Sequence, residues 1–271
     1  MKIIPLLSLI IIQALAGCAL RAPVAATPKS HVYQRASLEQ LLERLSSGSA
    51  NVTNLKADFS ASITDLTNGT TQSCSGILAM EKHEKLRMRG SRAMLPTLFD
   101  LLYNGNQLTL FIPRDKTVYR ATCDAGRARR GLTGVSFFTD IFLGNGDERG
   151  SLHFLETSTS RYTVYSIAPL KGHAQLLRKV YFDRENLVPL RYQYFDVEGI
   201  LACDIICSDF FVPMEGRESL PRQIALEAPP GENRIVLTLT AIRLNGHLNP
   251  DLFSFTMPAD ARVRPLEEYA R

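Results

Sequence analysis

Cysteine and histidine are the side chains of this sequence that could carry out nucleophilic, redox or metal chemistry, and each occurs five times. The histidines are scattered, and none has a serine or cysteine signature beside it (His31, His83, His153, His173 and His247). Cys203 and Cys207 lie in "ILACDIICSDFF", a pattern typical of a strand, on which they would be about 13 Å apart, too far for a disulfide. No histidine lies beside them to complete a metal site. Cys74 and Cys123 could form a disulfide, and the sequence leaves this open.

Motifs that hold phosphates or metals are also missing. The sequence has no glycine-rich phosphate loop, no HExxH pattern and no Asp/Gly-rich calcium loop. A formal charge of +4 over 271 residues is too small to indicate nucleic acid as a partner. We therefore expect no catalytic residue, no metal site, no cofactor and no enzymatic activity. A convergent triad remains open as an alternative, because its members need not be neighbours in the chain.

The remaining cysteine, Cys18, follows a segment typical of a bacterial secretory signal, in which Lys2 precedes the apolar stretch 3–16. These 14 residues are fewer than the roughly 20 that cross a bilayer as a permanent helix. The tetrapeptide "LAGC" at 15–18 resembles the lipobox of bacterial lipoproteins, in which the signal is cut before the cysteine and the thiol receives a diacylglycerol. We predict lipidation at Cys18, and an ordinary signal peptide with a chance cysteine is the alternative.

This interpretation divides the chain into a signal peptide (1–17), a lipidated cysteine with a flexible tether (18–36) and one domain (37–271). The tether contains two prolines and shows no hydrophobic periodicity. Alanine rather than aspartate follows Cys18, which under the enteric sorting rule favours the outer membrane. We therefore expect a protein anchored by lipid in the outer membrane, with its domain facing the periplasm.

The domain is predicted to be built mainly from strands. It opens with "SLEQLLERL", in which Ser37 and Gln40 form a capping-box signature and leucines recur at helical spacing. After this helix, apolar and polar residues alternate, as in "LKADFSASITD", and turn residues such as Asn-Gly separate the segments. About eleven short antiparallel strands in a single meander indicate one large curved sheet or barrel.

Two apolar stretches interrupt this alternation. "SRAMLPTLFDLLYNGN" (91–106) surrounds a proline, and "GRARRGLTGVSFFTDIFLGNG" (126–146) predicts a short helix that is apolar nearly all round and therefore buried. The arginines at the start of the second stretch (Arg127, Arg129 and Arg130) could meet phospholipid head groups, although three charges beside glycines are more typical of a solvated loop.

The order of these elements resembles the LolA/LolB superfamily of periplasmic lipoprotein carriers and receptors. The resemblance spans residues 37–260. It rests on the run from Gly76 through Arg89 into Asn104-Gly105 and on the closing pattern N-x-x-L-x-x-x-L-F-x-F-x-x-P at 245–258. It implies a mainly β (α+β) fold: an open half-barrel of about eleven antiparallel strands, with an N-terminal helix and short helices covering a concave apolar face that receives acyl chains. The lipidated cysteine is typical of the anchored, LolB-like members.

The resemblance also implies which residues contact lipid. On the concave face we expect acyl chains at Phe59, Leu78, Met80, Leu110, Val135, Phe138, Ile141 and Phe142. In receptor-type members an apolar loop between two early strands touches the membrane, and the matching place here is "RAMLPTLFD", with Met94, Leu95 and Phe99. Alternatively, these three side chains close one end of the barrel.

We therefore expect an outer-membrane lipoprotein that binds acyl chains and acts in lipoprotein or lipid localisation. Its expected partners are acyl chains or lipidated proteins, the membrane itself and a periplasmic carrier protein. The chain is longer than the well-studied receptors, with extra residues around 140–160 and 168–176, which puts delivery of lipoproteins in doubt. The alternative is a docking or sensing lipoprotein whose cavity is filled by its own side chains, and an apolar pocket would decide against it.

Overall fold

The computed structural model describes residues 32–47, 52–82, 85–92, 95–105, 107–122, 140–143, 150–170, 173–213, 219–228 and 230–266. The residues from Tyr33 onward form one compact unit. The predicted signal peptide and most of the predicted tether lie outside the described residues. Across the described part of the chain, no helix is long and apolar enough to cross a membrane.

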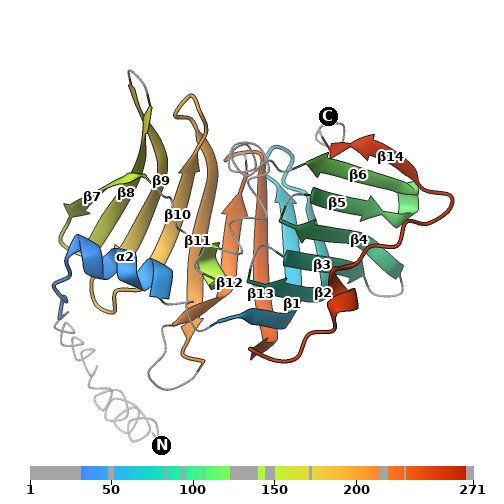
Figure 1. Ribbon diagram of the computed structural model, residues 1–271, viewed down its shortest axis with the longest axis horizontal. Helices are drawn as coiled ribbons and strands as arrows, with labels where there is room; N and C mark the ends of the chain where they lie inside the picture. The colour runs from blue at the N-terminus through green and yellow to red at the C-terminus, as the bar shows by residue number, and fades with distance from the viewer. Residues whose placement is uncertain are drawn as a thin grey trace, which may run out of the picture. The chain divides into compact units, whose positions relative to one another are not determined.

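One sheet, with fourteen strands among the described residues, dominates this unit (Figure 1). Helix α2 (Leu38–Ser47) comes before the strands. The first meander comprises β1 (Asn54–Asp65), β2 (Thr71–Glu81), β3 (Lys85–Arg92), β4 (Leu95–Asn104), β5 (Gln107–Ile112) and β6 (Thr117–Thr122), with the 3-10 helix η1 (Pro113–Asp115) before β6. The second comprises β7 (Leu152–Thr157), β8 (Arg161–Leu170), β9 (His173–Asp183), β10 (Pro189–Phe195), β11 (Leu201–Phe211), β12 (Leu220–Glu227) and β13 (Asn233–Leu244). A second 3-10 helix, η2 (Pro250–Phe253), and β14 (Arg262–Pro265) close the chain.

The strand order shows two meanders rather than the single one predicted. It runs β14-β6-β5-β4-β3-β2-β1-β13-β12-β11-β10-β9-β8-β7, so β1 pairs with β13 and joins the two halves at the centre of the sheet. A register shift between Lys56 and Asp58, opposite Ala241 with a φ of 48°, interrupts this pairing. Such bulges bend and twist a strand, which suits the centre of a curved sheet. The described strands form an open sheet, with β14 and β7 at its edges, as expected for a half-barrel.

The described residues contain fourteen strands where about eleven were predicted, and the reasons are physical. Strand β4 was assigned to an apolar interruption, because both of its faces are covered and its sequence therefore lacks the alternation of a half-wet strand. Strand β14 has four exposed residues and pairs with β6 in parallel, so it carries no apolar pattern and departs from the all-antiparallel prediction.

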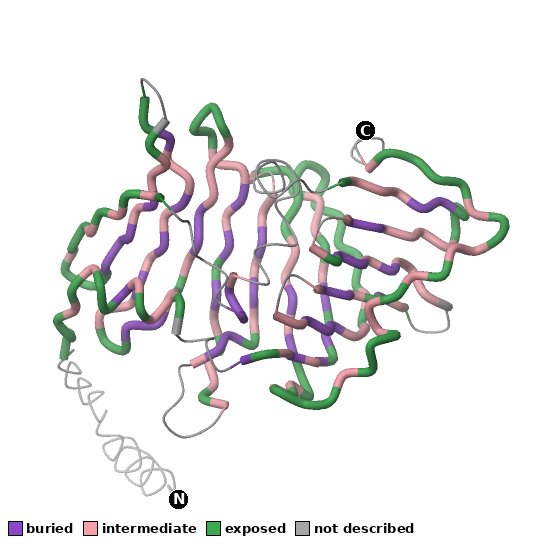
Figure 2. The backbone as a smooth tube through the Cα atoms, in the orientation of Figure 1, coloured by how far each residue is buried: buried purple, intermediate pink, exposed green. Residues whose placement is uncertain are grey.

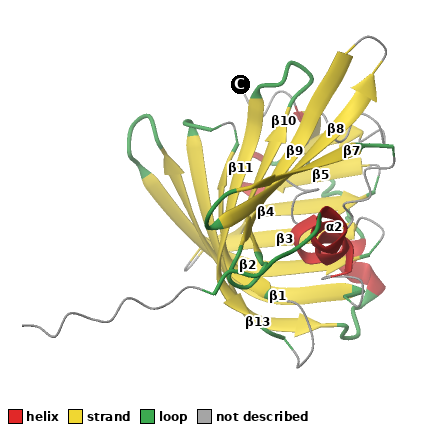
Figure 3. Ribbon diagram, turned by 90° about the vertical axis from the view of Figure 1, so that its left-hand side faces the viewer, coloured by secondary structure: helices red, strands yellow, loops and turns green. Residues whose placement is uncertain are grey.

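One face of the sheet, which we call the inner face, carries the buried apolar side chains of both meanders. Residues that lie opposite each other on neighbouring strands continue this face across the sheet, as Leu239 with Phe59 and Leu78 with Met88 do. Figure 2 shows buried positions along the middle of most strands and exposed positions at the turns and along β14. The sheet curves around the inner face, and α2 lies within the curve (Figure 3).

Helix α2 packs on this inner face as its leucine spacing predicts. Leu41 is fully buried in the core, and Leu38 packs against it. The predicted capping box is confirmed: the backbone N–H of Ser37 donates to Gln40 Oε1 at 2.9 Å, and the backbone N–H of Gln40 donates to Ser37 Oγ at 3.3 Å. The helix therefore begins where the sequence indicates.

Four residues that were assigned to the tether belong to this compact unit. The backbone N–H of Gln34 donates to the carbonyl of Arg184 at 2.7 Å, and the Tyr162 hydroxyl donates to the carbonyl of Gln34 at 3.0 Å. The guanidinium of Arg184 lies 5.4 Å from the ring centroid of Tyr33. Residues 33–36 are thus fixed beside the turns that precede β8 and β10.

The opposite, outer face differs between the two meanders. Residues 245–261, which we call the C-terminal strap, cross the outer face of β3, β4 and β5. Beneath the strap, Ala79, Leu102 and Val118 are buried although they point away from the inner core. The first meander is therefore dry on both faces near its centre.

Candidate functional site

A row of four residues crosses the inner face of the first meander and ends at Phe99, which lines the candidate site. Phe59, Gly76, Gly90 and Phe99 lie opposite one another on β1, β2, β3 and β4. A Cβ on Gly90 would lie 2.3 Å from the Phe99 ring, and one on Gly76 would lie 1.9 Å from the backbone oxygen of Arg89 and 2.9 Å from the Phe59 ring. Glycine at position 90 therefore lets the Phe99 ring lie against the sheet, and glycine at position 76 leaves room for the backbone of β3 and for the Phe59 ring.

A pocket of about 600 Å³ opens on the inner face beside this row, toward one end of the strands. Strands β1, β3 and β5 run in the same direction, so their carboxyl ends meet at this end of the sheet. The apolar part of the wall is formed by Ile63 from β1, Leu98 and Phe99 from β4, and Leu110 and Ile112 from β5. Its volume lies in the range of ligand pockets, about 300–1,000 Å³.

The floor of this pocket is continuous with the protein core. Cys74 and Phe99 line the pocket and also pack against the buried cluster. Burial raises the pKa of the Cys74 thiol, which is what apolar surroundings do to a group that would otherwise ionise. The mouth is wetter, because Ile63 is 38% exposed and Arg92, Arg114 and Asp115 are exposed.

The predicted acyl-binding residues fall into three groups. Leu110 lines the pocket. Phe59, Leu78 and Met80 are on the same inner face but are at most 3% exposed, so they belong to the packed core rather than to the pocket wall. Ile141 and Phe142 are buried against the core as well. Val135 and Phe138 lie outside the described residues.

The predicted membrane-contact residues lie mostly in a strand. From Leu95 onward the segment belongs to β4, which pairs with β3 and β5, so the protruding loop predicted for "RAMLPTLFD" is a strand over residues 95–99. Register shifts on either side of Ser91 accommodate Pro96 near the start of this strand. Phe99 packs over Gly90 and lines the pocket, while Met94 lies outside the described residues.

A second group of inner-face residues is polar. Asp140 precedes the buried residues 141–143, and its Oδ2 accepts from the Tyr194 hydroxyl at 3.3 Å and lies 3.9 Å from Arg178 Nη1. Burial, followed by the charge of Asp140, raises the pKa of Tyr194 well above its ordinary value, so this hydroxyl stays protonated and can donate. These contacts hold residues 140–143 against β9 and β10.

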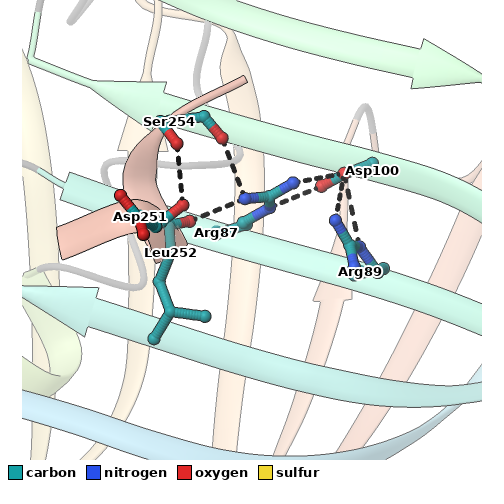
Figure 4. Close-up of polar contacts among 6 residues, drawn as sticks. All are labelled: Arg87, Arg89, Asp100, Asp251, Leu252 and Ser254. Atoms are coloured by element: carbon teal, nitrogen blue, oxygen red, sulfur yellow. Dashed lines mark hydrogen bonds and ion pairs between the residues drawn. The ribbon is translucent and has the colours of Figure 1, made fainter. Parts of the chain in front are cut away.

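The outer face carries a charge cluster at the strap, in which Arg87 and Asp100 are buried and Arg89 is partly exposed (Figure 4). Asp100 accepts from Arg87 Nε at 2.9 Å and Nη2 at 2.6 Å, and from Arg89 Nη2 at 3.0 Å. Arg87 Nη1 donates to the carbonyls of Leu252 at 2.9 Å and Ser254 at 3.0 Å. Burial raises the pKa of Asp100, but the hydrogen bonds and charges of Arg87 and Arg89 outweigh it, so the pKa lies below its ordinary value. This cluster fixes the strap to the sheet.

Among the described residues, no group of three or more His, Cys, Asp or Glu side chains is placed to hold a metal ion. Ser166 Oγ lies 3.2 Å from His153 Nδ1, and Ser166 is 1% exposed. Cys203 and Cys207 are free, buried thiols, and burial raises the pKa of Cys207 to about 12. Cys74 is also a free thiol, and the disulfide with Cys123 that the sequence left open involves a residue outside the described ranges.

Sequence reasoning identified part of this pocket and missed its mouth. Ile63 and Ile112 were recognised only as strand residues, and Arg92 and Arg114 were not singled out. One signal was available, since Arg92 ends one strand and Arg114 follows shortly after another. Placing them at the same end of the sheet requires the strand order, which local patterns do not contain.

The fold is found in several solved structures. A LolA superfamily protein from Nitrosomonas europaea is 14% identical, with a TM-score of 0.57 over 82% of this chain and 99% of that chain. A DUF1329 family protein from Desulfovibrio piger is 13% identical, with a TM-score of 0.57 over 79% of this chain and 94% of that one. A domain provisionally described as an outer membrane lipoprotein-sorting protein, from Vibrio parahaemolyticus, is 13% identical, with a TM-score of 0.55 over 78% and 94%. No protein-family model matches the sequence, and no curated protein matches it.

Proposed function

Because this chain has the LolA-like superfamily fold, we propose that it is a lipid-anchored envelope protein whose inner face binds acyl chains. The proposed role is localisation of lipids or lipoproteins to the outer membrane. The relatives support it through their fold, and one of them through its described role in lipoprotein sorting.

The pocket on the first meander carries this proposal. It has an apolar wall, it opens to solvent at one end of the strands, and its floor joins the core through Phe99. Burying an acyl chain there releases about 25 cal/mol for each square ångström of apolar surface removed from water. Both the ligand and the exposed apolar side chain of Ile63 contribute such surface.

The other parts of the proposal rest on the sequence. Lipidation at Cys18 supplies the anchor, and two or three acyl chains bind a membrane firmly because each buried methylene adds about 0.8 kcal/mol. Ala19 favours the outer membrane, with the domain in the periplasm, where a carrier protein would deliver cargo. We propose a binding role without catalysis.

A docking or sensing role is the second candidate, and one observation favours it. Phe142 is fully buried and Ile141 nearly so, which means that side chains of this protein already fill part of the inner face. A protein with no remaining ligand space would use its surface instead. The 600 Å³ pocket at the other half of the sheet favours binding over this alternative.

Binding of N-phenylnaphthylamine, an uncharged fluorophore that brightens in apolar surroundings, tests the proposal. A soluble form of residues 19–271 should show saturable fluorescence, and Ile63→Gln should weaken the apparent affinity about threefold to tenfold because it places an amide in the apolar wall. Ile206→Gln is the matched control, since Ile206 lies on the outer face and is 43% exposed against 38% for Ile63.

The outcomes separate the two candidates. Saturable binding that Ile63→Gln weakens and Ile206→Gln leaves intact supports the acyl-binding role. Absence of saturable binding, or equal effects of the two substitutions, contradicts it and favours the docking role. Lipid extraction from protein purified out of membranes provides a second measurement, because a bound amphiphile should accompany the protein.

A further inference from the structure

The mouth of the inner-face pocket carries two arginines, Arg92 and Arg114. Arg92 ends β3 with its side chain on the inner side of the sheet, since it continues the series of Met88 and Gly90. Arg114 lies in η1, directly after β5. Both line the pocket, and neither has an ion-pair partner among the described residues.

The surroundings of these arginines leave a net positive charge. Within the described part of the chain, Asp115 is the only acidic residue that lines the pocket, so two positive charges face one negative charge at the mouth. Other polar lining groups, such as Gln72, Ser73 and Thr97, are neutral. Guanidinium groups bind carboxylate and phosphate oxygens through paired, charge-assisted hydrogen bonds.

The wall behind the mouth is apolar and leads away from these charges. Leu110 and Phe99 lie deeper on the same face than Arg92, and Phe99 reaches the core. A ligand that satisfies both regions has an apolar chain and an anionic end. A pocket of about 600 Å³ is of the size that holds one drug-sized ligand, about 300–1,000 Å³, and so suits one chain rather than several.

We propose that the pocket selects a single-chain anionic amphiphile, with the chain against β1, β4 and β5 and the anionic group between Arg92 and Arg114. This inference rests on the proposed acyl-binding function and adds to it the class of ligand. The charge at the mouth orients the ligand, and the apolar wall supplies the bulk of the affinity. Uncharged amphiphiles with the same chain leave the arginines without a partner and bind more weakly.

Competition against N-phenylnaphthylamine tests this selectivity. The competitors are myristate, myristyl alcohol and myristyltrimethylammonium, which share one chain length and differ in the charge of the end group. Myristate should displace the fluorophore at a concentration about tenfold lower than the alcohol, since a charge-assisted pair is roughly twice as strong as a neutral hydrogen bond. The trimethylammonium compound should be the weakest competitor.

Two variants locate the effect at the mouth. In Arg92→Gln/Arg114→Gln, myristate and the alcohol should compete equally within about twofold, each measured against the affinity of that variant for the fluorophore. Asp115→Asn should act in the opposite direction and increase the preference for myristate. Arg243→Gln is the matched control, because Arg243 is an exposed arginine on β13 outside the pocket.

The possible results distinguish the proposed selectivity for anionic ligands from the proposed acyl-binding function. If the fluorophore binds but myristate and the alcohol compete equally, or if the double variant keeps the preference, the anionic selectivity is wrong and the acyl-binding function stands. If the fluorophore does not bind at all, both are wrong. Unfolding midpoints of the variants, which change exposed side chains, should match the wild type.

Discussion

The two meanders share one inner face and differ on the outer one. In the first meander the strap covers the outer face and Asp100 is 5% exposed beneath it. In the second, outer-face residues such as Ile206 are exposed, although Thr163 and Gln193 are buried, and Arg161 and Arg191 lie 5.4 and 5.7 Å from the centroid of the Tyr181 ring. The inner faces show the reverse pattern, because α2 and residues 140–143 cover the second meander, whereas the first contains the pocket.

The two halves of the sheet are therefore packed in different ways. The first meander has a pocket of about 600 Å³ on its inner face and another of about 510 Å³ on its outer face beside the strap, where Arg87 and Asp100 are nevertheless buried. The second meander is packed on its inner face. Substitutions that probe matching positions in the two halves can test this interpretation.

The largest expected effect comes from two ion pairs with the same spacing. Arg87 pairs with Asp100 and Arg191 with Asp204, each pair across neighbouring strands, but the first is buried and the second is partly exposed. Asp100→Asn should lower the free energy of unfolding by about 3 kcal/mol or more, since it leaves Arg87 charged and buried. Asp204→Asn should cost about 1 kcal/mol or less, because solvent screens its pair. Urea unfolding of both variants measures the difference.

The pH dependence of stability tests whether the ionised Arg87–Asp100 pair causes the effect of Asp100→Asn. The pKa of Asp100 in the folded protein lies below its ordinary value of 3.8, so its contribution to stability is complete above that value and is lost as the pH falls through the folded pKa. The gap between wild type and Asp100→Asn should therefore be constant above about pH 5 and shrink below about pH 4. A gap that does not shrink at any pH between 5 and the acid limit of folding would argue against the ionised pair as its source.

A smaller effect is expected from Gly90 in the first meander. Gly90→Ala places a Cβ where the Phe99 ring lies, so the ring must move and the free energy of unfolding should fall by about 1–3 kcal/mol. Because Phe99 lines the pocket, binding of N-phenylnaphthylamine should change as well. Gly246→Ala is the control: a Cβ on this residue would meet no described atom within 4 Å, and its effect should stay within about 0.5 kcal/mol.

The smallest effect concerns the cover of the second meander. Ser37→Ala removes the hydroxyl that accepts from the N–H of Gln40, and should cost about 1 kcal/mol of stability through helix α2. Since α2 contacts β7 at the far edge from the pocket, the affinity for the fluorophore should not change. A loss of fluorophore binding in this variant would show that the two halves are coupled.

The sequence predicted strands with one exposed face better than strands that are covered on both faces. The strands of the second meander have one wet face, so their alternation was visible, and the helix beginning at Ser37 was marked by its cap. Strand β4 was missed because Leu102 and Asp100 are buried on its outer face while Leu101 packs towards the inner core, which removes the alternation. Alternation of apolar and polar residues reveals the buried face of a strand only when the other face is exposed to solvent.

The apolar residues of the candidate site could be predicted from the sequence, but their arrangement around one pocket could not. Apolar residues such as Leu110 and Phe99 were expected to meet lipid or to close the barrel, and the structure places both in the wall of one pocket. Arg92 and Arg114 are more than twenty residues apart in the sequence, and no local pattern relates them. They meet because β3 and β5 run in the same direction on either side of β4.

The amino-acid sequence by itself determined the mainly β composition, the capped helix, the apolar residues of the inner face and the pattern around Cys18 that predicts an anchor. Each of these depends on residue type and on spacing within one element. Only the tertiary structure decided that β1 joins β13, that the strap buries Arg87 and Asp100, and that a pocket opens between Ile63 and Arg114. These features arise from pairing between distant segments, whose free energy depends on contacts that no single segment makes alone.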